Sequence, residues 1–485
     1  MRSDPEVARE SLFNQMVKLI ARPLLESDIS TVIVIDALDE CKDEESTSAI
    51  LSVLGQIVSE IPKVKFLVTG RPEPRIQEGF RLPLLAEATD VFVLHEVEPS
   101  QVASDIRVFF SHKFSEIVRR RRGSNDWPTK EQLDLLCKRA AGLFIYAVAT
   151  VKFINKRSTS PRVQLDLLLQ SPESTVREGR TRFKENVTLN SLYMTVLQEA
   201  FGPDDDPDND PKVRSALGAV VLAANPLSLL TIATLLGIDA EDLLPTLSSV
   251  QSLLILDENV NSPVRPFHKS FPDFIIDPDR CTSHRFHVSP PYHHSQLLLR
   301  CLDLMNRALE KNMCGLPDGV ANSDIGDLVE RVERCVNPAL RYACRSWHTH
   351  LADRELTPEH ALNITSALHR FLERKFLFWL EVLSMLGDVR NAVDALRDAT
   401  DWLEVCLDMI PIVLLNSSDV IQESPTLELA IGCSLFVTGY FDIISASSPH
   451  IYHSALVSTP KTSIVRKLYD SHARPLVRVV HGVPS

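Results

Sequence analysis

The chain has 485 residues, of which 44% are hydrophobic and 24% are charged, a composition typical of a soluble globular protein. Its formal net charge of −13 argues against a general nucleic-acid binder, which would need a positive or densely basic surface. The nine cysteines are dispersed and form no C-x-x-C pair, which favours reduced thiols in a cytoplasmic protein over a disulfide framework or a zinc site.

The first hundred residues predict an α/β unit. Residues 31–35 form a run of apolar, β-branched side chains without alternation, which is typical of a strand buried on both faces of a parallel sheet. Residues 65–70 and 90–98 are further apolar strands, and residues 5–26 and 45–60 show helical spacing. Strands linked through a helix form a βαβ unit, so we expect 31–35 to pair directly and in parallel with 65–69, with 90–97 beside the second strand.

The rest of the chain predicts mostly helices. Residues 215–238 carry no charge and are long enough to span a bilayer, but Asn225-Pro226 divides them, which predicts two buried core helices and no membrane segment. An acidic, proline-rich linker at 201–211 predicts a domain boundary. Other predicted features are helices over 99–120, 130–156 and 293–415, a winged-helix pattern over 212–280 that ends in a short strand pair, and a poorly ordered tail over 461–485.

Acidic side chains follow the first strand at the point where ligands bind in open α/β sheets. Asp36, Asp39 and Glu40 come after 31–35, while Thr69 and Arg71 end the second strand. In P-loop nucleotidases the strand-end aspartate helps to hold Mg²⁺, and a following acid orients the attacking water. An arginine on the neighbouring strand end can contact the γ-phosphate. The alternative is that the acids only cap the next helix.

The phosphate-binding loop of such enzymes is not found in this sequence. None of the 16 glycines belongs to a G-x-x-x-x-G-K-[ST] motif. That loop supplies the backbone N–H groups and the lysine that hold the phosphates. Without it, Asp36 has no Mg-nucleotide to coordinate.

Some histidines could bind a phosphate or a metal ion. His268, in the stretch "RPFHKSFPDF", either meets a phosphate of a ligand or is a surface residue near a helix start, and the residues alone favour the second. The pairs His293-His294 and His348-x-His350 have no carboxylate or cysteine at ligand spacing, so we interpret them as structural or surface residues.

Several of these stretches resemble the NACHT domains of STAND-class P-loop NTPases. "VIVIDALDEC" and "FLVTGRPEP" look like the Walker B and sensor-1 stretches, and "AAGLFIYAVAT" looks like the start of the following helical segment. "FHKSF" resembles the winged-helix stretch of NOD-like receptors, and "HKSFPDFIIDPDRC" a fungal NACHT family that usually carries C-terminal WD repeats. The phosphate loop and the WD repeats are missing, as though the chain were truncated at both ends.

The resemblance implies roles for the residues at these places. Asp36 would be the Walker B acid that reaches Mg²⁺ through the nucleotide. The hydrolytic acid would be Asp39 or Glu40. Arg71 and Thr69 would contact the nucleotide from the sensor strand, and His268 would contact the phosphate of bound ADP from the winged helix.

The sequence as a whole therefore predicts an α/β plus α fold, with a partial parallel P-loop NTPase sheet followed by mostly helical domains. We expect a cytoplasmic signalling switch with ATP or ADP and Mg²⁺ as family cofactors that this chain alone does not bind, or binds weakly. Protein partners are expected, with oligomerisation on activation in the family; the alternative is a helical interaction scaffold without nucleotide chemistry. The expected domains are a partial NACHT core over 1–98, a helical segment over 99–200, a winged-helix-like domain over 201–285, a helical domain over 290–415 and a helical or irregular tail over 416–485.

Overall fold

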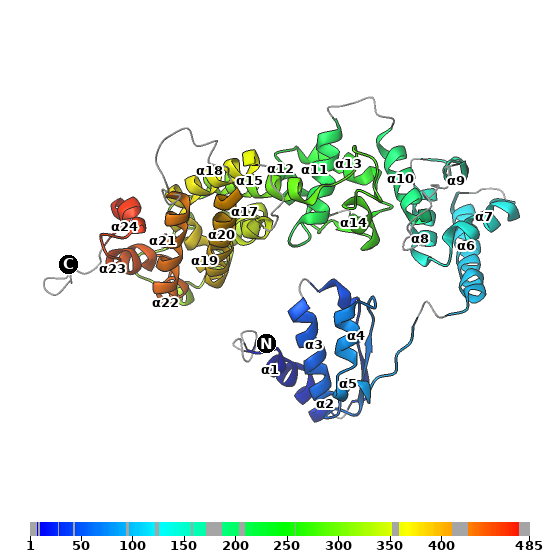
Figure 1. Cartoon of the computed structure of the whole chain (residues 1–485), viewed down its shortest axis with the longest axis horizontal. Coiled ribbons are helices and arrows are strands. Elements are labelled where there is room, and N and C mark those ends of the chain that lie inside the picture. The colour runs from blue at the N-terminus through cyan, green and yellow to red at the C-terminus, as the bar shows by residue number, and fades with distance from the viewer. Residues whose placement is uncertain are drawn as a thin grey trace. The chain divides into compact units, whose positions relative to one another are not determined.

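A computed structural model shows two compact units, Met1–Glu98 and Pro99–Ser485 (Figure 1). The finer boundaries expected within the second unit stay predictions. The residues that the structure describes are 7, 10–27, 29–41, 44–93, 97–121, 126–156, 159–170, 187–202, 209–257, 259–351, 358–409 and 425–474.

The first unit contains a two-stranded parallel sheet. Strand β1 (Thr31–Ile35) pairs directly with β2 (Val64–Val68), in a register that places Thr31 opposite Val64 and Ile35 opposite Val68. This confirms the direct parallel pairing expected from two apolar runs joined by one helix. The expected third strand over 90–98 is wrong where the structure describes it, since 90–93 form no strand and 94–96 lie outside the described residues. Val91 and Phe92 there are 73% and 77% exposed, so no packing holds them in a ladder.

The sheet is covered on one face, which corrects the expectation of burial on both. Val32, Val34 and Leu67 point away from the helices and are 60%, 59% and 54% exposed. Their neighbours on the other face pack against Leu51 of α3 and Ile76 of α4. The helices of this unit are α1 (Leu12–Met16), the π-helix η2 (Val17–Ala21), α2 (Arg22–Ser27), α3 (Glu44–Ile57), α4 (Pro74–Phe80) and α5 (Pro83–Ala86).

The second unit begins with helices that share one hydrophobic core. Helix α6 (Pro99–Arg121) buries Phe110 and Phe114, which lie four residues apart and so face the same side. Helix α7 begins at a capping box in which Thr129 and Gln132 exchange side-chain and backbone hydrogen bonds. The helices that follow α6 are α7 (Lys130–Ala140), α8 (Phe144–Ile154), α9 (Pro161–Gln170) and α10 (Val187–Phe201).

The uncharged stretch forms two helices, as expected. Helix α11 (Asn209–Leu222) ends before Asn225-Pro226, and α12 (Leu229–Leu236) begins after it with Ser228 as its N-cap. Among the described residues, no helix is long and apolar enough to cross a bilayer. The elements that follow are α13 (Ala240–Ser249), the antiparallel strands β3 (Leu254–Ile255) and β4 (Arg265–Pro266), and α14 (Ser270–Ile275).

The remaining described elements are helices, and α15 packs beside α18, as α20 does beside α21 (Figure 1). The tail over 461–485 is expected to be poorly ordered, and this expectation is wrong for the part up to residue 474. Helix α24 (Ile464–Tyr469) buries Val465 and Tyr469, because an apolar face docks on the helical core; residues 475–485 lie outside the described part. The elements are α15 (Pro290–Ala308), η6 (Asn322–Asp324), α16 (Leu328–Cys335), α17 (Pro338–Ser346), η7 (Trp347–His350), α18 (Pro358–Arg374), α19 (Phe376–Met385), α20 (Val389–Met409), α21 (Pro425–Gly439), α22 (Phe441–Ala446), η9 (Ile451–Ala455), α23 (Leu456–Ser458), α24 and η10 (Asp470–His472).

Candidate functional site

The carboxyl ends of β1 and β2 are joined by a small hydrogen-bond network. The backbone N–H of Thr69 donates to the carbonyl of Ile35 at 2.9 Å, and the N–H of Leu38 donates back to the carbonyl of Thr69 at 2.9 Å. The Thr69 hydroxyl donates to a carboxylate oxygen of Asp36 and accepts the N–H of Ala37 at 3.0 Å. Ala37 adopts a left-handed conformation with φ of 54°, which turns the chain sharply after the strand. The structure therefore brings two of the expected site residues, Asp36 and Thr69, into contact.

Asp39 is buried and committed to holding the loop after β2. Its side chain is 5% exposed, and one carboxylate oxygen accepts the backbone N–H of Arg71 at 3.1 Å. The other oxygen lies 3.6 Å from Nε of Arg71, whose side chain is 44% exposed. These two contacts join the loop after β1 to the loop after β2. Asp39 thus positions Arg71 at the strand ends.

Asp36 and Glu40 are the exposed acids of the cluster. The Glu40 side chain makes no hydrogen bond or ion pair within the described part of the chain, and Asp36 is held only through Thr69. Both carboxylates are free to meet a ligand at the edge where open α/β sheets bind them. Of the two acids that the sequence offers for hydrolysis, Glu40 is exposed, whereas Asp39 is buried and bonded to Arg71.

A metal ion would need ligands beyond these side chains. Among the described residues no group of three or more His, Cys, Asp or Glu side chains is placed to hold a metal. Mg²⁺ in nucleotide sites takes one or two carboxylates and fills its remaining positions with phosphate oxygens and water. Asp36 fits Mg²⁺ as part of a metal-nucleotide complex but does not form a metal site by itself.

Sequence reasoning missed Arg75. Its guanidinium donates to the backbone carbonyl of Asp39 at 3.0 Å and pairs with Glu73 at 2.8 Å, and its side chain is 17% exposed. Arg75 therefore anchors the loop after β1 from the start of α4. The only signal in the sequence was a second arginine four residues after Arg71, which by itself indicates no contact.

His268 in the second unit is exposed, with a defined ring orientation. Its Nδ1 accepts the backbone N–H of Ser270 at 3.2 Å and lies 2.6 Å from the Ser270 hydroxyl, which in turn lies 2.7 Å from the hydroxyl of Tyr193. Because a backbone N–H can only donate, Nδ1 is the acceptor, and the neutral ring carries its proton on Nε2. Burial raises the pKa of Tyr193 to about 12, so its hydroxyl stays protonated.

A lysine from α8 lies beside the same segment. The ammonium of Lys152 sits 3.2 Å from the centroid of the Phe267 ring, a cation–π contact next to His268 in the chain. Burial lowers the pKa of Lys152 from its ordinary value. This corner of the second unit therefore offers the N–H of an imidazole and a nearby ammonium, which are groups that bind phosphate.

The two halves of the expected site lie in different units. Asp36, Glu40, Thr69 and Arg71 belong to the first unit, and His268 belongs to the second. The expectation that His268 faces the strand ends stays a prediction.

The other histidines have structural contacts. His348 pairs with Asp398 at 2.8 Å, and Nδ1 of His293 lies 2.8 Å from the carbonyl of Ser289. His350 contacts His294 at 2.9 Å and the hydroxyl of Tyr342 at 2.8 Å, and burial lowers its pKa to about 3. These contacts agree with the structural reading of both pairs.

Comparisons with known proteins support the resemblance. Residues 1–71 match the family described as Nephrocystin 3, N-terminal. The chain is also 23% identical over 464 residues to the Vegetative incompatibility protein HET-E-1 of Podospora anserina, a match that covers 90% of this chain and 30% of that protein. The chain thus spans less than a third of that relative's length. Together the two matches support the resemblance of this chain to NACHT-family proteins.

Proposed function

We propose that this chain carries the regulatory part of a STAND-type signalling switch, with the remnant of a nucleotide site at the carboxyl ends of β1 and β2. The contact between Asp36 and Thr69 across the two strand ends carries the proposal. An acid and a hydroxyl fixed at this edge form half of the polar surface that a Mg-nucleotide meets in P-loop proteins.

In this proposal each residue has a separate task. Asp36 and Thr69 face the metal and its water, Glu40 orients the attacking water, and Arg71 contacts the terminal phosphate. Asp39 and Arg75 are positioning residues, because their contacts are with Arg71 and with the loop backbone. The Nε2 proton of His268 would be donated to a phosphate oxygen of ADP, as the winged-helix reading of α11–α14 implies.

Nucleotide binding by this chain should be weak. The residues present contact the metal and the outer phosphates, but no glycine-rich loop in the sequence supplies the N–H cradle and the lysine that bind most of the charge. A switch works only if the nucleotide binds one state better than the other, so a weak ligand shifts the two states little. Hydrolysis by the chain alone is not expected.

A titration with Mg-ADP tests this proposal. Isothermal calorimetry on the full chain should show saturable binding no tighter than about 1 mM, which corresponds to about −4 kcal/mol. Substituting His268→Ala or Asp36→Ala should weaken it further, whereas His284→Ala, which alters a histidine outside the proposed site, should not. A micromolar dissociation constant would contradict the proposed site, and so would an affinity that neither substitution changes.

The second candidate is a helical interaction scaffold without nucleotide chemistry. One observation favours it: a single hydrophobic core runs through the second unit, from Ile106 of α6 to Tyr469 of α24. Such a core supports a large surface for partners and needs no ligand to form. In the same titration the scaffold predicts no heat of ADP binding at any accessible concentration.

A further inference from the structure

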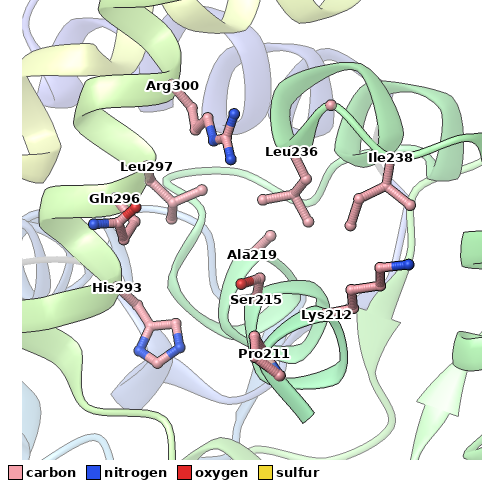
Figure 2. Close-up of a pocket in the computed structure, with 11 residues that line it drawn as sticks. Pro211, Lys212, Ser215, Ala219, Leu236, Ile238, His293, Gln296, Leu297 and Arg300 are labelled. Atoms are coloured by element: carbon pink, nitrogen blue, oxygen red, sulfur yellow. The ribbon is translucent and has the colours of Figure 1, made fainter. Parts of the chain in front are cut away.

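A basic pocket lies within the second unit, between α11, the end of α12 and α15 (Figure 2). Its volume is about 300 Å³, at the lower end of the range for ligand pockets. None of the proposed nucleotide-site residues contributes to it, so the inference below does not depend on the proposed function. Its lining residues include Lys212, Ser215, Ala219, Leu236, His293 and Arg300.

Two cations line the pocket, and its wall contains no acid. Arg300 extends from α15 toward the end of α12, and Lys212 lies on the first turns of α11 (Figure 2). Neither side chain makes a hydrogen bond or an ion pair within the described part of the chain. The N-terminal end of α11 adds the partial positive charge of its helix dipole. The wall that a ligand meets therefore carries two cations and no carboxylate.

His293 adds an acceptor to the wall. Its Nδ1 donates to the carbonyl of Ser289 at 2.8 Å, so Nε2 of the neutral ring bears the free lone pair. Burial lowers the pKa of His293, and the charge of nearby Arg214 lowers it further, which keeps the ring neutral. The ring lies so close to α11 that a Cβ at Gly218 would stand 2.6 Å from it. Glycine at this position is what allows the ring to sit beside the pocket.

The rest of the wall is largely apolar. Ala219 and Leu236 are buried, and together with Ile238 and Leu297 they form a surface that excludes water from the body of a ligand. Ser215 adds one hydroxyl near the pocket floor (Figure 2). Convergent polar groups on a mostly apolar wall are typical of small-molecule sites.

We propose that this pocket binds a small phosphomonoester with an apolar body. A phosphate monoester carries a charge near −2 at neutral pH, which matches the two unpaired cations, and Arg300 can bind its oxygens in a bidentate manner. The apolar body lies against Ala219 and Leu236. His293 accepts a hydrogen bond from a hydroxyl or N–H group of the ligand.

Phenyl phosphate is a suitable probe, with phenol and benzoate as matched comparisons. Calorimetry on the full chain should show phenyl phosphate binding with a submillimolar dissociation constant, and phenol and benzoate at least tenfold weaker. Arg300→Gln and Lys212→Gln should each weaken binding at least fivefold. Arg307→Gln is the matched control, because Arg307 lies on the same helix, pairs with Asp303 and does not line the pocket, so affinity should not change.

Three outcomes would overturn the proposal. Phenyl phosphate could fail to bind at 10 mM, or benzoate could bind as tightly, which would remove the preference for phosphate. The third is an unchanged affinity in the Arg300→Gln/Lys212→Gln double variant, which would place the ligand elsewhere. A Ser215→Leu variant, which fills the pocket floor without altering charge, should also abolish binding. Tryptophan fluorescence and circular dichroism identical to the unsubstituted chain establish that each variant is folded.

Discussion

Removing the Asp39 carboxylate should destabilise the strand ends of the first unit. Asp39→Ala removes the hydrogen bond from the backbone N–H of Arg71 to the Asp39 carboxylate, and a hydrogen bond to a charged group contributes about 1.5–3 kcal/mol. The ion pair adds little, because Arg71 is 44% exposed and solvent screens it. We therefore expect a loss of about 2–3 kcal/mol. The exposed Glu40 has no such contact, so Glu40→Ala should change stability by less than about 0.5 kcal/mol.

Hydrogen exchange measured by mass spectrometry resolves this effect, because all four tryptophans lie beyond residue 98 and fluorescence does not report on the first unit. Amides of β2 and the loop to Arg71 should exchange roughly 30- to 150-fold faster in Asp39→Ala, as 1.4 kcal/mol is a factor of ten. Asp39→Asn keeps an acceptor oxygen, so its amide exchange rates should lie between those of the unsubstituted chain and those of Asp39→Ala. Equal exchange in Asp39→Ala and Glu40→Ala would refute the positioning role of Asp39.

Three further predictions concern burial, charge and turnover. Glu381 is buried against Tyr452, and burial raises its pKa to about 7. Between about pH 4.5 and pH 7 the folded chain therefore holds a proton on Glu381 that the unfolded chain has lost. The free energy of unfolding should be greatest below about pH 4.5, fall by about 3 kcal/mol as the pH rises to about 7, and then level off. Urea unfolding followed by tryptophan fluorescence at pH 5 and pH 8 checks this, and an equally steep fall in Glu381→Gln would contradict it. Leu51→Ala should lower the free energy of unfolding of the first unit by about 2–5 kcal/mol, because Leu51 is 0% exposed. Val34→Ala should lower it by less than about 0.5 kcal/mol, because Val34 is 59% exposed. Similar changes in hydrogen exchange in both variants would contradict a sheet that is covered on one face only. Finally, a phosphate-release assay should show no ATP turnover above buffer, and turnover that disappears in Asp39→Ala/Glu40→Ala would overturn this.

The pairing of the two strands could be predicted, whereas the burial of their faces could not. Apolar runs joined by one helix leave parallel pairing as the common solution, and β1 and β2 follow it. In Thr31–Ile35 the residues of both faces are apolar or β-branched, so alternation carries no information about which face is covered. Only the packing of α3 and α4 shows which face of the sheet is covered.

Proline obscured two helices of the first unit. Pro74 and Pro83 stand at the first positions of α4 and α5, where the missing N–H costs nothing. No element is predicted from the sequence between the expected strands at 65–70 and 90–98. The helix start at Leu12, several residues later than expected, follows from Ser11, whose hydroxyl accepts the N–H of Asn14 and caps the helix.

Contacts between distant residues explain the rest of the difference. The pairing of Asp39 with Arg71 spans 32 residues and gives no periodic signal in a single sequence. The basic pocket joins Lys212 with Arg300 across two helices that are separated in the chain, and its volume depends on side-chain packing. His268 was found only because its stretch resembles a known family. Its fixed ring orientation depends on Tyr193, which the sequence did not connect with it.

The central claim is that the strand ends of the first unit keep part of a nucleotide site, carried by the contact between Asp36 and Thr69. A calorimetric titration with Mg-ADP, on the unsubstituted full chain and on Asp36→Ala, tests this claim most directly. We expect weak, saturable binding to the unsubstituted chain, no tighter than about 1 mM, and weaker binding to Asp36→Ala. Equal binding to both chains would contradict the claim.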